Sequence, residues 1–435
     1  MLTKKISFMF LVLVLFLGIL AGCNKGKSSS DDSNGEKDQK SSEITVGVEA
    51  GGPYTEFYKD IVDEFTQKTG VKVNFIEIPH DSMHQRFLTE AMSATGSIDV
   101  YQTDQPWISE FAAKGFLEPL SDRISEKDLK DFVEDAIETV KYKDEIYALP
   151  YLVHTPIVYY RTDLFEKAGL KTPPATWDEY RNYAKKLNNI EPGVHGTIIE
   201  GKQTGEPVTH LLDVIHQSGG GLWDKDGNVI FNSPEVKNAF KYLVAIQHED
   251  KTSPSGAVGY DNADVHNLFM QGKVAMVKNW PYMYALANNP ESSKVAGKFS
   301  VAVQPKGQQN GSAIWSWGYG ISSDSKNKDA AWEFVKWATS SEVVQRLGTQ
   351  FINPVPRHSA LEAISKDAKL TEKDKEAITI MSEAIVGGVS FTETPKFPSI
   401  QERLAVTLSR IMSQPNSLDE ELKATADDIQ EILKR

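Results

Sequence analysis

The fold is decided by three runs of strand length, ITVGV at residues 44–48, VKVNFI at 71–76 and IDVY at 98–101, and by the helical patterns between them. After the first run, Phe57, Ile61 and Phe65 recur at helical spacing, and Gly70 ends the pattern. This order of strand, helix and strand predicts an α/β fold with a largely parallel sheet.

The alternation resumes in the middle of the chain. Thr176 and Glu179 (TWDE) form a capping box, which predicts a helix start. Ser233 followed by Pro234 predicts another, with serine as the cap and proline at the first helical position. The sequence shows no internal repeat or heptad run, so we expect successive α/β units.

The first 22 residues have the pattern of a secretory signal. Lys4 and Lys5 precede an apolar run over residues 6–19, which is short for a membrane span and closes in small residues. Cys23 follows directly in the sequence LAGC and is the only cysteine among 435 residues. This ending resembles the lipobox of bacterial lipoproteins, in which the cysteine is lipidated and becomes the first mature residue. We therefore predict a signal peptide over residues 1–22 and lipidation of Cys23.

The predicted mature chain is acidic. The full sequence carries a formal net charge of −13, and removal of residues 1–22 takes away Lys4 and Lys5 but no acid, which leaves −15. Such a surface disfavours nucleic acid and anionic membranes as partners, because both are polyanions. No later apolar run is long enough to span a bilayer, so lipid alone is expected to hold the protein.

The segment after the predicted anchor has a different composition from the rest of the chain. Residues 24–43 are built mostly from Ser, Asp, Lys, Gly and other polar residues, with no aromatic side chain. Such a segment buries too little apolar surface to offset its ordering entropy. We predict that residues 23–43, the lipidated cysteine included, form a disordered linker.

Four groups of segments together resemble the extracellular sugar-binding proteins of ABC importers, the family that includes maltose-binding protein. Their order and spacing carry the resemblance, which spans the chain from about residue 44 to residue 435. They are 160–170 (YRTDLFEKAGL) with 176–179; 219–221 (GGG) with 224–227 and 231–235 (FNSPE); 269–276 (FMQGKVAM) with Trp280; and 317–322 (WGYGIS) with 325–332.

The resemblance implies a two-lobed fold of the type II periplasmic-binding-protein class, with ligand held in the cleft between lobes. The chain is expected to cross between lobes near residues 153–155, 312–317 and 389–396. The implied N-terminal lobe is residues 44–153 plus 318–388, and the implied C-terminal lobe is 156–314 plus 396–435. Clefts at the carboxyl ends of parallel strands are also the general expectation for open α/β sheets.

The resemblance also implies ligand-binding residues. Asp104 stands where relatives place a carboxylate that accepts hydrogen bonds from sugar hydroxyls, with a helix cap or turn acid as the alternative role. Trp280 and Tyr282 lie where relatives place a stacking aromatic, and His154 falls where some relatives have an acid. The remaining candidates, for which a role in the core or a turn is the alternative, are Trp107, Trp315, Trp317, Glu49 and Tyr54.

Signals of catalysis and metal binding are poor. The chain has no phosphate-binding loop, no GxSxG elbow, no HExxH motif and no cysteine cluster. His80 and His84 have the spacing of a metal pair, but without further nearby His ligands they are read as a solvated helix face. We predict a binding protein with no catalytic residue, no metal and no cofactor.

The sequence therefore predicts a monomeric protein, lipid-anchored on the outer face of the cell membrane, that binds a mono- or oligosaccharide or polyol and delivers it to an ABC permease. Two alternatives stay open. A surface lipoprotein glycosidase acting on polysaccharide would need two carboxylates about 5 to 9 Å apart across one bond. A binding protein for a non-sugar solute, such as a polyamine, would need a ring of acids around an amine.

Overall fold

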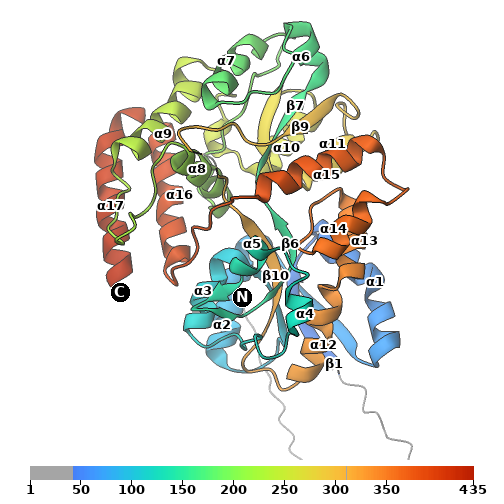
Figure 1. Ribbon diagram of the computed structural model, residues 1–435. Coiled ribbons are helices and arrows are strands. Elements are labelled where there is room, and N and C mark those ends of the chain that lie inside the picture. The colour runs from blue at the N-terminus through green and yellow to red at the C-terminus, as the bar shows by residue number, and fades with distance from the viewer. Residues whose placement is uncertain (1–42, 310) are drawn as a thin grey trace, which may run out of the picture. The chain divides into compact units, whose positions relative to one another are not determined.

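The computed structural model describes residues 43–309 and 311–435, which form two main sheets with surrounding helices (Figure 1). The predicted signal peptide, Cys23 and the linker up to residue 42 lie outside the described residues. We call the larger sheet with its helices the first lobe and the smaller sheet with its helices the second lobe.

The first lobe is built on a five-stranded sheet in the order β2-β1-β3-β10-β6. Its strands are β1 (Glu43–Glu49), β2 (Lys72–Ile78), β3 (Val100–Asp104), β6 (Leu149–His154) and β10 (Trp315–Ile321). β1 runs parallel to β2 and β3, as predicted, whereas β10 is antiparallel to both β3 and β6. The prediction of a largely parallel sheet is therefore wrong: the sheet is mixed, because a strand from late in the chain is inserted into it.

Helices cover both faces of this sheet, with α2 and α3 on one side and α1 and α12 on the other (Figure 1). α1 buries Phe57, Ile61 and Phe65 and ends where Gly70 adopts φ 75°, which confirms the predicted helix. The elements of this lobe are α1 (Pro53–Thr69), α2 (His80–Ser93), α3 (Gln105–Ala113), α4 (Glu126–Leu129), α5 (Glu134–Glu138), the hairpin β4 (Lys141–Tyr142) and β5 (Glu145–Ile146), α12 (Lys328–Ala338), α13 (Ser341–Phe351) and α14 (His358–Ser365).

The second lobe is built on a three-stranded antiparallel sheet in the order β8-β7-β9. Its strands are β7 (Ile157–Arg161), β8 (Met276–Asn279) and β9 (Phe299–Ala302). Its helices are α6 (Thr162–Ala168), α7 (Trp177–Leu187), α8 (Gly205–Gln217), α9 (Pro234–Val244) with a π-helical extension (Ala245–Glu249), a 3-10 turn (Ala257–Gly259), α10 (Asn262–Met270) and α11 (Met283–Asn288).

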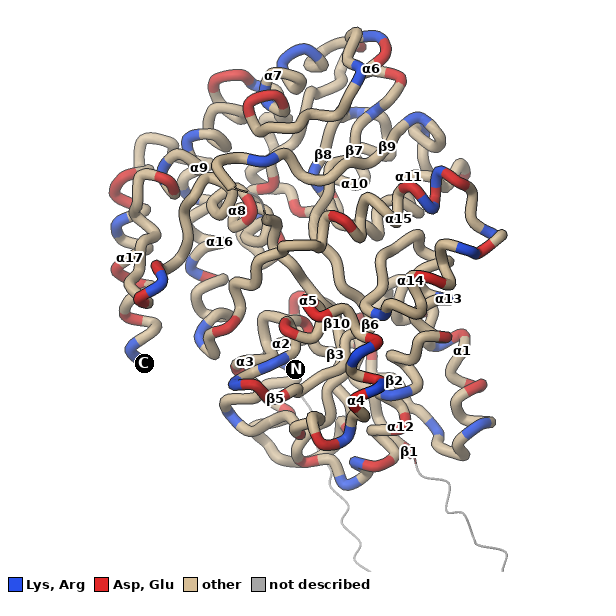
Figure 2. The backbone as a smooth tube through the Cα atoms, in the orientation of Figure 1, with Lys and Arg blue, Asp and Glu red and all other residues tan. Residues whose placement is uncertain are grey.

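Three further elements close the chain: α15 (Glu372–Ile385), α16 (Phe397–Ser413) and, after a 3-10 turn at Pro415–Ser417, α17 (Leu418–Lys434). α15 packs against β6 of the first lobe and β9 of the second. α16 and α17 share an apolar core with α8 and α9. Acidic and basic residues are interspersed along the outer helices, α17 among them (Figure 2).

Two predicted helix starts are seen in the second lobe. Ser233 caps α9 by accepting a hydrogen bond from Val236 N at 3.4 Å. Thr176 caps α7 by accepting one from Glu179 N at 3.2 Å. The capping box is only half formed, because the Glu179 carboxylate accepts from Ala175 N at 2.8 Å and not from Thr176 N.

Three segments cross between the two lobes, and two of them are paired with each other. β6 ends at His154 and β7 begins at Ile157, so two residues separate the sheets there. The return crossing pairs with the third one, because Ile314 N donates to Val389 O at 3.1 Å and Val389 N donates to Ser312 O at 2.9 Å.

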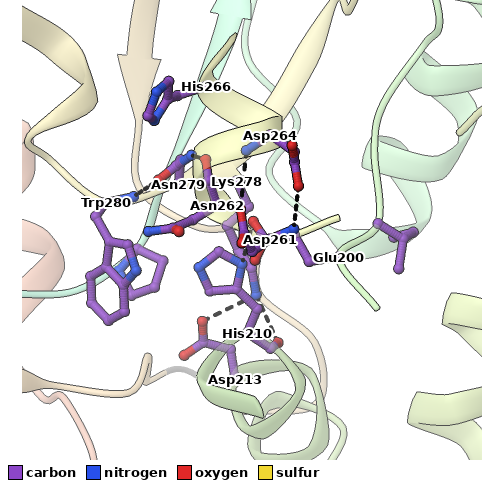
Figure 3. Close-up of polar contacts among 12 residues, drawn as sticks. Glu200, His210, Asp213, Asp261, Asn262, Asp264, His266, Lys278, Asn279 and Trp280 are labelled. Atoms are coloured by element: carbon purple, nitrogen blue, oxygen red, sulfur yellow. Dashed lines mark hydrogen bonds and ion pairs between the residues drawn. The ribbon is translucent and has the colours of Figure 1, made fainter. Parts of the chain in front are cut away.

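A buried aspartate ties these crossings to the second lobe. Asp213 on α8 is fully buried and accepts hydrogen bonds from Lys278 Nζ at 3.1 Å, Gln304 Nε2 at 2.9 Å and Ala313 N at 2.5 Å. Gln304 Nε2 also donates to Pro156 O at 2.7 Å. This carboxylate therefore joins α8 and β8 to the crossing segment between β9 and β10, and Gln304 connects that segment to the first crossing. The contact of Asp213 with Lys278 is seen in Figure 3.

Candidate functional site

The carboxyl ends of β1 and β3 bring two of the predicted residues to one edge of the first sheet. These strands are parallel and adjacent, so Glu49 and Asp104 at their ends point to the same region. Glu49 N donates to Gln102 Oε1 at 2.6 Å, which fixes the end of β1 against β3. Asp104 occupies the N-cap position of α3 but makes no capping hydrogen bond, and its Oδ1 accepts from Trp315 Nε1 at 2.6 Å.

The Asp104 carboxyl is held close to its titration point. Burial raises its pKa from 3.8 to about 6, and the charge of Glu49 adds to the rise. The neighbouring His80 and the hydrogen bond from Trp315 oppose this shift. At neutral pH the group is a desolvated carboxylate with unused acceptor capacity, which is suited to directional hydrogen bonds from hydroxyl groups.

Replacing Asp104 by asparagine should stabilise the free protein at pH 7.5. A folded-state pKa raised to about 6 means that the favourable contribution of the protonated group is complete below pH 4 and is lost as the pH rises through 6. Asn stays neutral and can still accept from Trp315 Nε1, so the gain should be about 2–3 kcal/mol at pH 7.5 and vanish near pH 4. Urea unfolding at the two pH values measures it, and a wild type as stable as Asp104→Asn at pH 7.5 would contradict it.

Three aromatic candidates lie together beside Asp104. His154 and Trp315 face each other across β6 and β10. The Trp280 ring, which follows β8, lies 4.5 Å from the His154 ring and 6.3 Å from the Trp315 ring between centroids. All three are at least nine-tenths buried. The first two come from the first sheet and Trp280 from the second lobe, so this cluster spans the two lobes.

His154 is electrically neutral at physiological pH. Burial lowers its pKa to about 3, and its Nδ1 neither accepts nor donates a hydrogen bond within the described chain. The imidazole therefore offers a stacking surface to Trp280 and one unused polar atom.

Tyr282 and Tyr54 occupy different surroundings. Tyr282 is half-buried, packs against the cores of both lobes, and its hydroxyl lies 2.9 Å from His266 Nδ1. Burial and the charges of Glu206 and Glu200 raise its pKa. Tyr54 lies in the first-lobe core, where its hydroxyl accepts a hydrogen bond from Asn353 Nδ2.

The last two aromatic candidates form a layer next to Glu49. Trp317 is half-buried, with its ring 5.6 Å from that of His80 and 6.3 Å from that of Trp107. His80 Nδ1 lies 3.5 Å from Glu49 Oε1. Trp107 also packs against His84, and therefore has a role in the first-lobe core.

The paired histidines of α2 do not converge on a metal site. His84 Nε2 lies 2.7 Å from Glu110 Oε2, whereas His80 faces Glu49 and Trp317. Across residues 43–309 and 311–435 no three His, Cys, Asp or Glu side chains are grouped as metal ligands. Within the same ranges no helix is both long and apolar enough to cross a bilayer.

Sequence reasoning missed three residues of the second lobe. Glu206 in the first turn of α8 and the buried Glu200 and His210 lie beside Trp280 and Tyr282, with 5.9 Å between the His210 and Trp280 ring centroids. Burial and the negative charges of Glu200, Asp104, Glu49 and Asp261 raise the pKa of Glu206 well above its ordinary value. Nothing in the sequence distinguishes Glu200 and Glu206 from the rest of the 60 Asp and Glu residues of the chain.

Comparison with known proteins places this arrangement in context. Residues 51–345 match the sequence pattern of the bacterial extracellular solute-binding proteins. The chain is 26% identical over 382 residues to the mannitol-binding protein of Pseudomonas aeruginosa, covering 84% of this chain and 87% of that protein. It is 27% identical over 351 residues to the arabinooligosaccharide-binding protein of Bacillus subtilis, covering 78% and 77%.

A solved structure shares the architecture as well. Maltose-bound MalE3 of T. maritima superposes with a TM-score of 0.82 at 26% identity, covering 89% of this chain and 99% of that one. This likeness confirms the predicted two-lobed α/β fold. The exact lobe boundaries and the roles of single residues in binding remain predictions.

Proposed function

The chain belongs to the bacterial extracellular solute-binding proteins, and from this premise we propose that it captures a sugar or polyol outside the cell and delivers it to an ABC permease. The observation that supports this most is the meeting of the Asp104 carboxylate with Trp315, His154 and Trp280. A sugar has apolar C–H faces and a rim of hydroxyl groups, so an aromatic wall next to an acceptor suits it.

The proposed mechanism is closure of the two lobes on the ligand. Asp104 and Trp315 come from the first sheet and Trp280 from the second lobe, so a ligand that contacts all three stabilises the closed form over the open one. The crossing segments, two of which are paired with each other, are where the backbone would absorb such a movement. The closed form would then be presented to the permease.

A thermal-shift screen of mono- and oligosaccharides and polyols tests this function. A cognate compound at a hundredfold excess over its dissociation constant should stabilise the folded protein by about 3 kcal/mol. Small-angle scattering should show contraction on its addition, and chromatography should recover it unchanged. Chemically altered sugar after long incubation would support the glycosidase alternative, and a screen without any stabilising sugar or polyol would contradict the proposal.

Membrane attachment through Cys23 is part of the same proposal. Cys23→Ala should release the protein into the medium or leave an uncleaved precursor, because a lipobox without its cysteine cannot be lipidated. Cell fractionation with antibody detection measures the outcome, and Ser30→Ala in the predicted linker serves as a control that should stay anchored. A Cys23→Ala protein of mature size that stays wholly with the membranes after washing would exclude lipid anchoring.

A further inference from the structure

Five acidic residues act on one another at the proposed binding site. Glu206 lies one helical turn before His210 on α8, and His210 Nδ1 lies 3.3 Å from Glu200 Oε1. Glu49 and Asp104 come from the edge of the first sheet, and Glu200, Glu206 and Asp261 come from the second lobe. The charges of the other four all raise the pKa of Glu206. We call these five residues the acidic group. Its members come from both lobes, so the group surrounds whatever the lobes enclose.

Basic side chains do not neutralise the centre of the acidic group. The two lysines that form ion pairs in this region are already engaged, Lys202 with Asp261 at 2.5 Å and Lys278 with Asp213 at 3.1 Å. In the described ranges, no Lys or Arg forms an ion pair with Glu200, Glu206 or Asp104. The histidine that stacks on Trp280 is held neutral by its burial. Glu49 faces His80 at 3.5 Å, and among the described basic side chains Glu200 faces only His210. The raised pKa of Glu206 favours its protonated form until a cation binds, so the site is acidic and gains negative charge when a cation enters.

The hydrogen bonding of Glu200 is a second, independent indication of a ligand. Its side chain is 3% exposed, and neither carboxylate oxygen accepts a hydrogen bond within the described chain. His210 Nδ1 lies 3.3 Å from Oε1 without hydrogen-bond geometry, and His210 Nε2 is likewise unsatisfied. A buried carboxylate without hydrogen-bond donors is costly, because it has lost its water and gained no partner in exchange. Glu200 and His210 also line a cavity of about 50 Å³ in the second lobe, together with Lys278 and mainly apolar side chains of α7, α8 and α9.

A protonated amine satisfies these requirements better than a hydroxyl group. An ammonium supplies three donors and a positive charge, so it can bind two carboxylates at once by charge-assisted hydrogen bonds. Tyr282, near Glu200 and Glu206, and Trp280 are aromatic rings of the kind that attract a cation through their quadrupoles. The same aromatic faces can hold the ring of a sugar.

Resting on the proposed sugar-binding function, we propose that the ligand is an amino sugar or an oligosaccharide containing one, with its ammonium group between Glu200 and Glu206. Asp104 then accepts hydrogen bonds from the hydroxyl groups, and the sugar ring stacks on Trp280. A neutral sugar would leave Glu200 without a charged partner, and for this reason the site discriminates in favour of the amine.

Matched sugars test this proposal. Calorimetric titrations at pH 6.5 compare three series, based on glucose, galactose and mannose. Each series contains the neutral sugar, its β-linked disaccharide, and the 2-amino-2-deoxy and 2-acetamido-2-deoxy derivatives of both. In the series that binds, the amino form should bind at least about tenfold more tightly than the neutral and acetylated forms. Added salt should reduce this preference, because it screens the charge on the ligand.

Charge-neutral variants locate the amine. Glu206→Gln and Glu200→Gln should each reduce the amino preference to less than about threefold, whereas the neutral sugar should bind with little change. Glu206 is half-buried, so its variant keeps the test valid even if Glu200→Gln fails to fold. Glu420→Gln, an exposed change of equal charge in the first turn of α17, should leave the preference intact.

The possible results distinguish a failure of the amine proposal from a failure of the sugar-binding function. Equal or tighter binding of the neutral sugar would overturn the amine proposal and leave the sugar-binding function standing. An amino preference that survives both Gln variants would overturn the placement between Glu200 and Glu206. Binding of spermidine in the absence of any sugar or amino sugar binding would overturn the proposed function and this inference together.

Discussion

Trp280→Ala should weaken ligand binding by at least about 30-fold. Truncating a central tryptophan in a desolvated site typically costs about 2 kcal/mol or more of binding free energy, which corresponds to that factor. The Trp280 ring lies within stacking distance of His154 and near both Trp315 and His210, so its loss removes the wall that joins the two lobes. Calorimetry with the compound found in the screen measures the effect.

The burial of Trp280 requires controls for folding. Only 5% of its surface is exposed, and it packs in the second-lobe core, so truncation should also cost stability. Trp280→Phe keeps a ring and most of the packing, and should retain the fold with an intermediate affinity. Trp332→Ala, in the first-lobe core on α12, should lose stability without losing affinity. Unchanged affinity in Trp280→Ala would show that this tryptophan belongs to the core alone.

Asp213→Asn should destabilise the protein by about 3–5 kcal/mol. Removing one partner of a buried ion pair leaves an uncompensated charge, here the Lys278 ammonium, whose side chain is 12% exposed. Asp213 accepts hydrogen bonds from three donors, and the NH₂ group of the asparagine amide would face one of them and lose that hydrogen bond. Denaturant unfolding by fluorescence measures the loss of stability.

A double-mutant cycle makes this prediction specific. Lys278→Met should remove the buried ammonium, and its combination with Asp213→Asn should recover part of the lost stability. The exposed pair Lys237 and Asp419 is the matched control, because Asp419→Asn should change stability by less than about 1 kcal/mol. Additive losses for Asp213→Asn and Lys278→Met would show that the two groups do not stabilise each other.

Local patterns predicted much of the fold. The three strand runs, the helix ended by Gly70 and the Ser233 cap are each encoded within a few residues, and the structure has all of them. The antiparallel strand β10 could not be derived in this way, because its neighbours β3 and β6 are far away in the sequence. The half-formed capping box at Thr176 also depends on backbone detail that residue types do not carry.

The candidate site was predictable to a smaller extent. Alternating aromatic residues do not reveal whether a ring faces a core or a cleft, and only the contacts separate Trp315, which donates to Asp104, from Trp107, which packs beside His84. Glu200 and Glu206 gave no signal, since an acidic chain has many such residues. Their importance depends on burial and on neighbours contributed by other segments.

The late insertion of β10 constrains how the polypeptide folds as it is made. β10 lies between β3 and β6, so the first sheet cannot be completed until residue 321 has emerged from the ribosome or an export channel. Until then β6 has no strand partner, and one edge of β3 is open. Unpaired strand edges invite pairing with other chains. The nascent protein should therefore depend on chaperones for most of its synthesis. A chain truncated before residue 315 should aggregate and not fold into an isolated lobe.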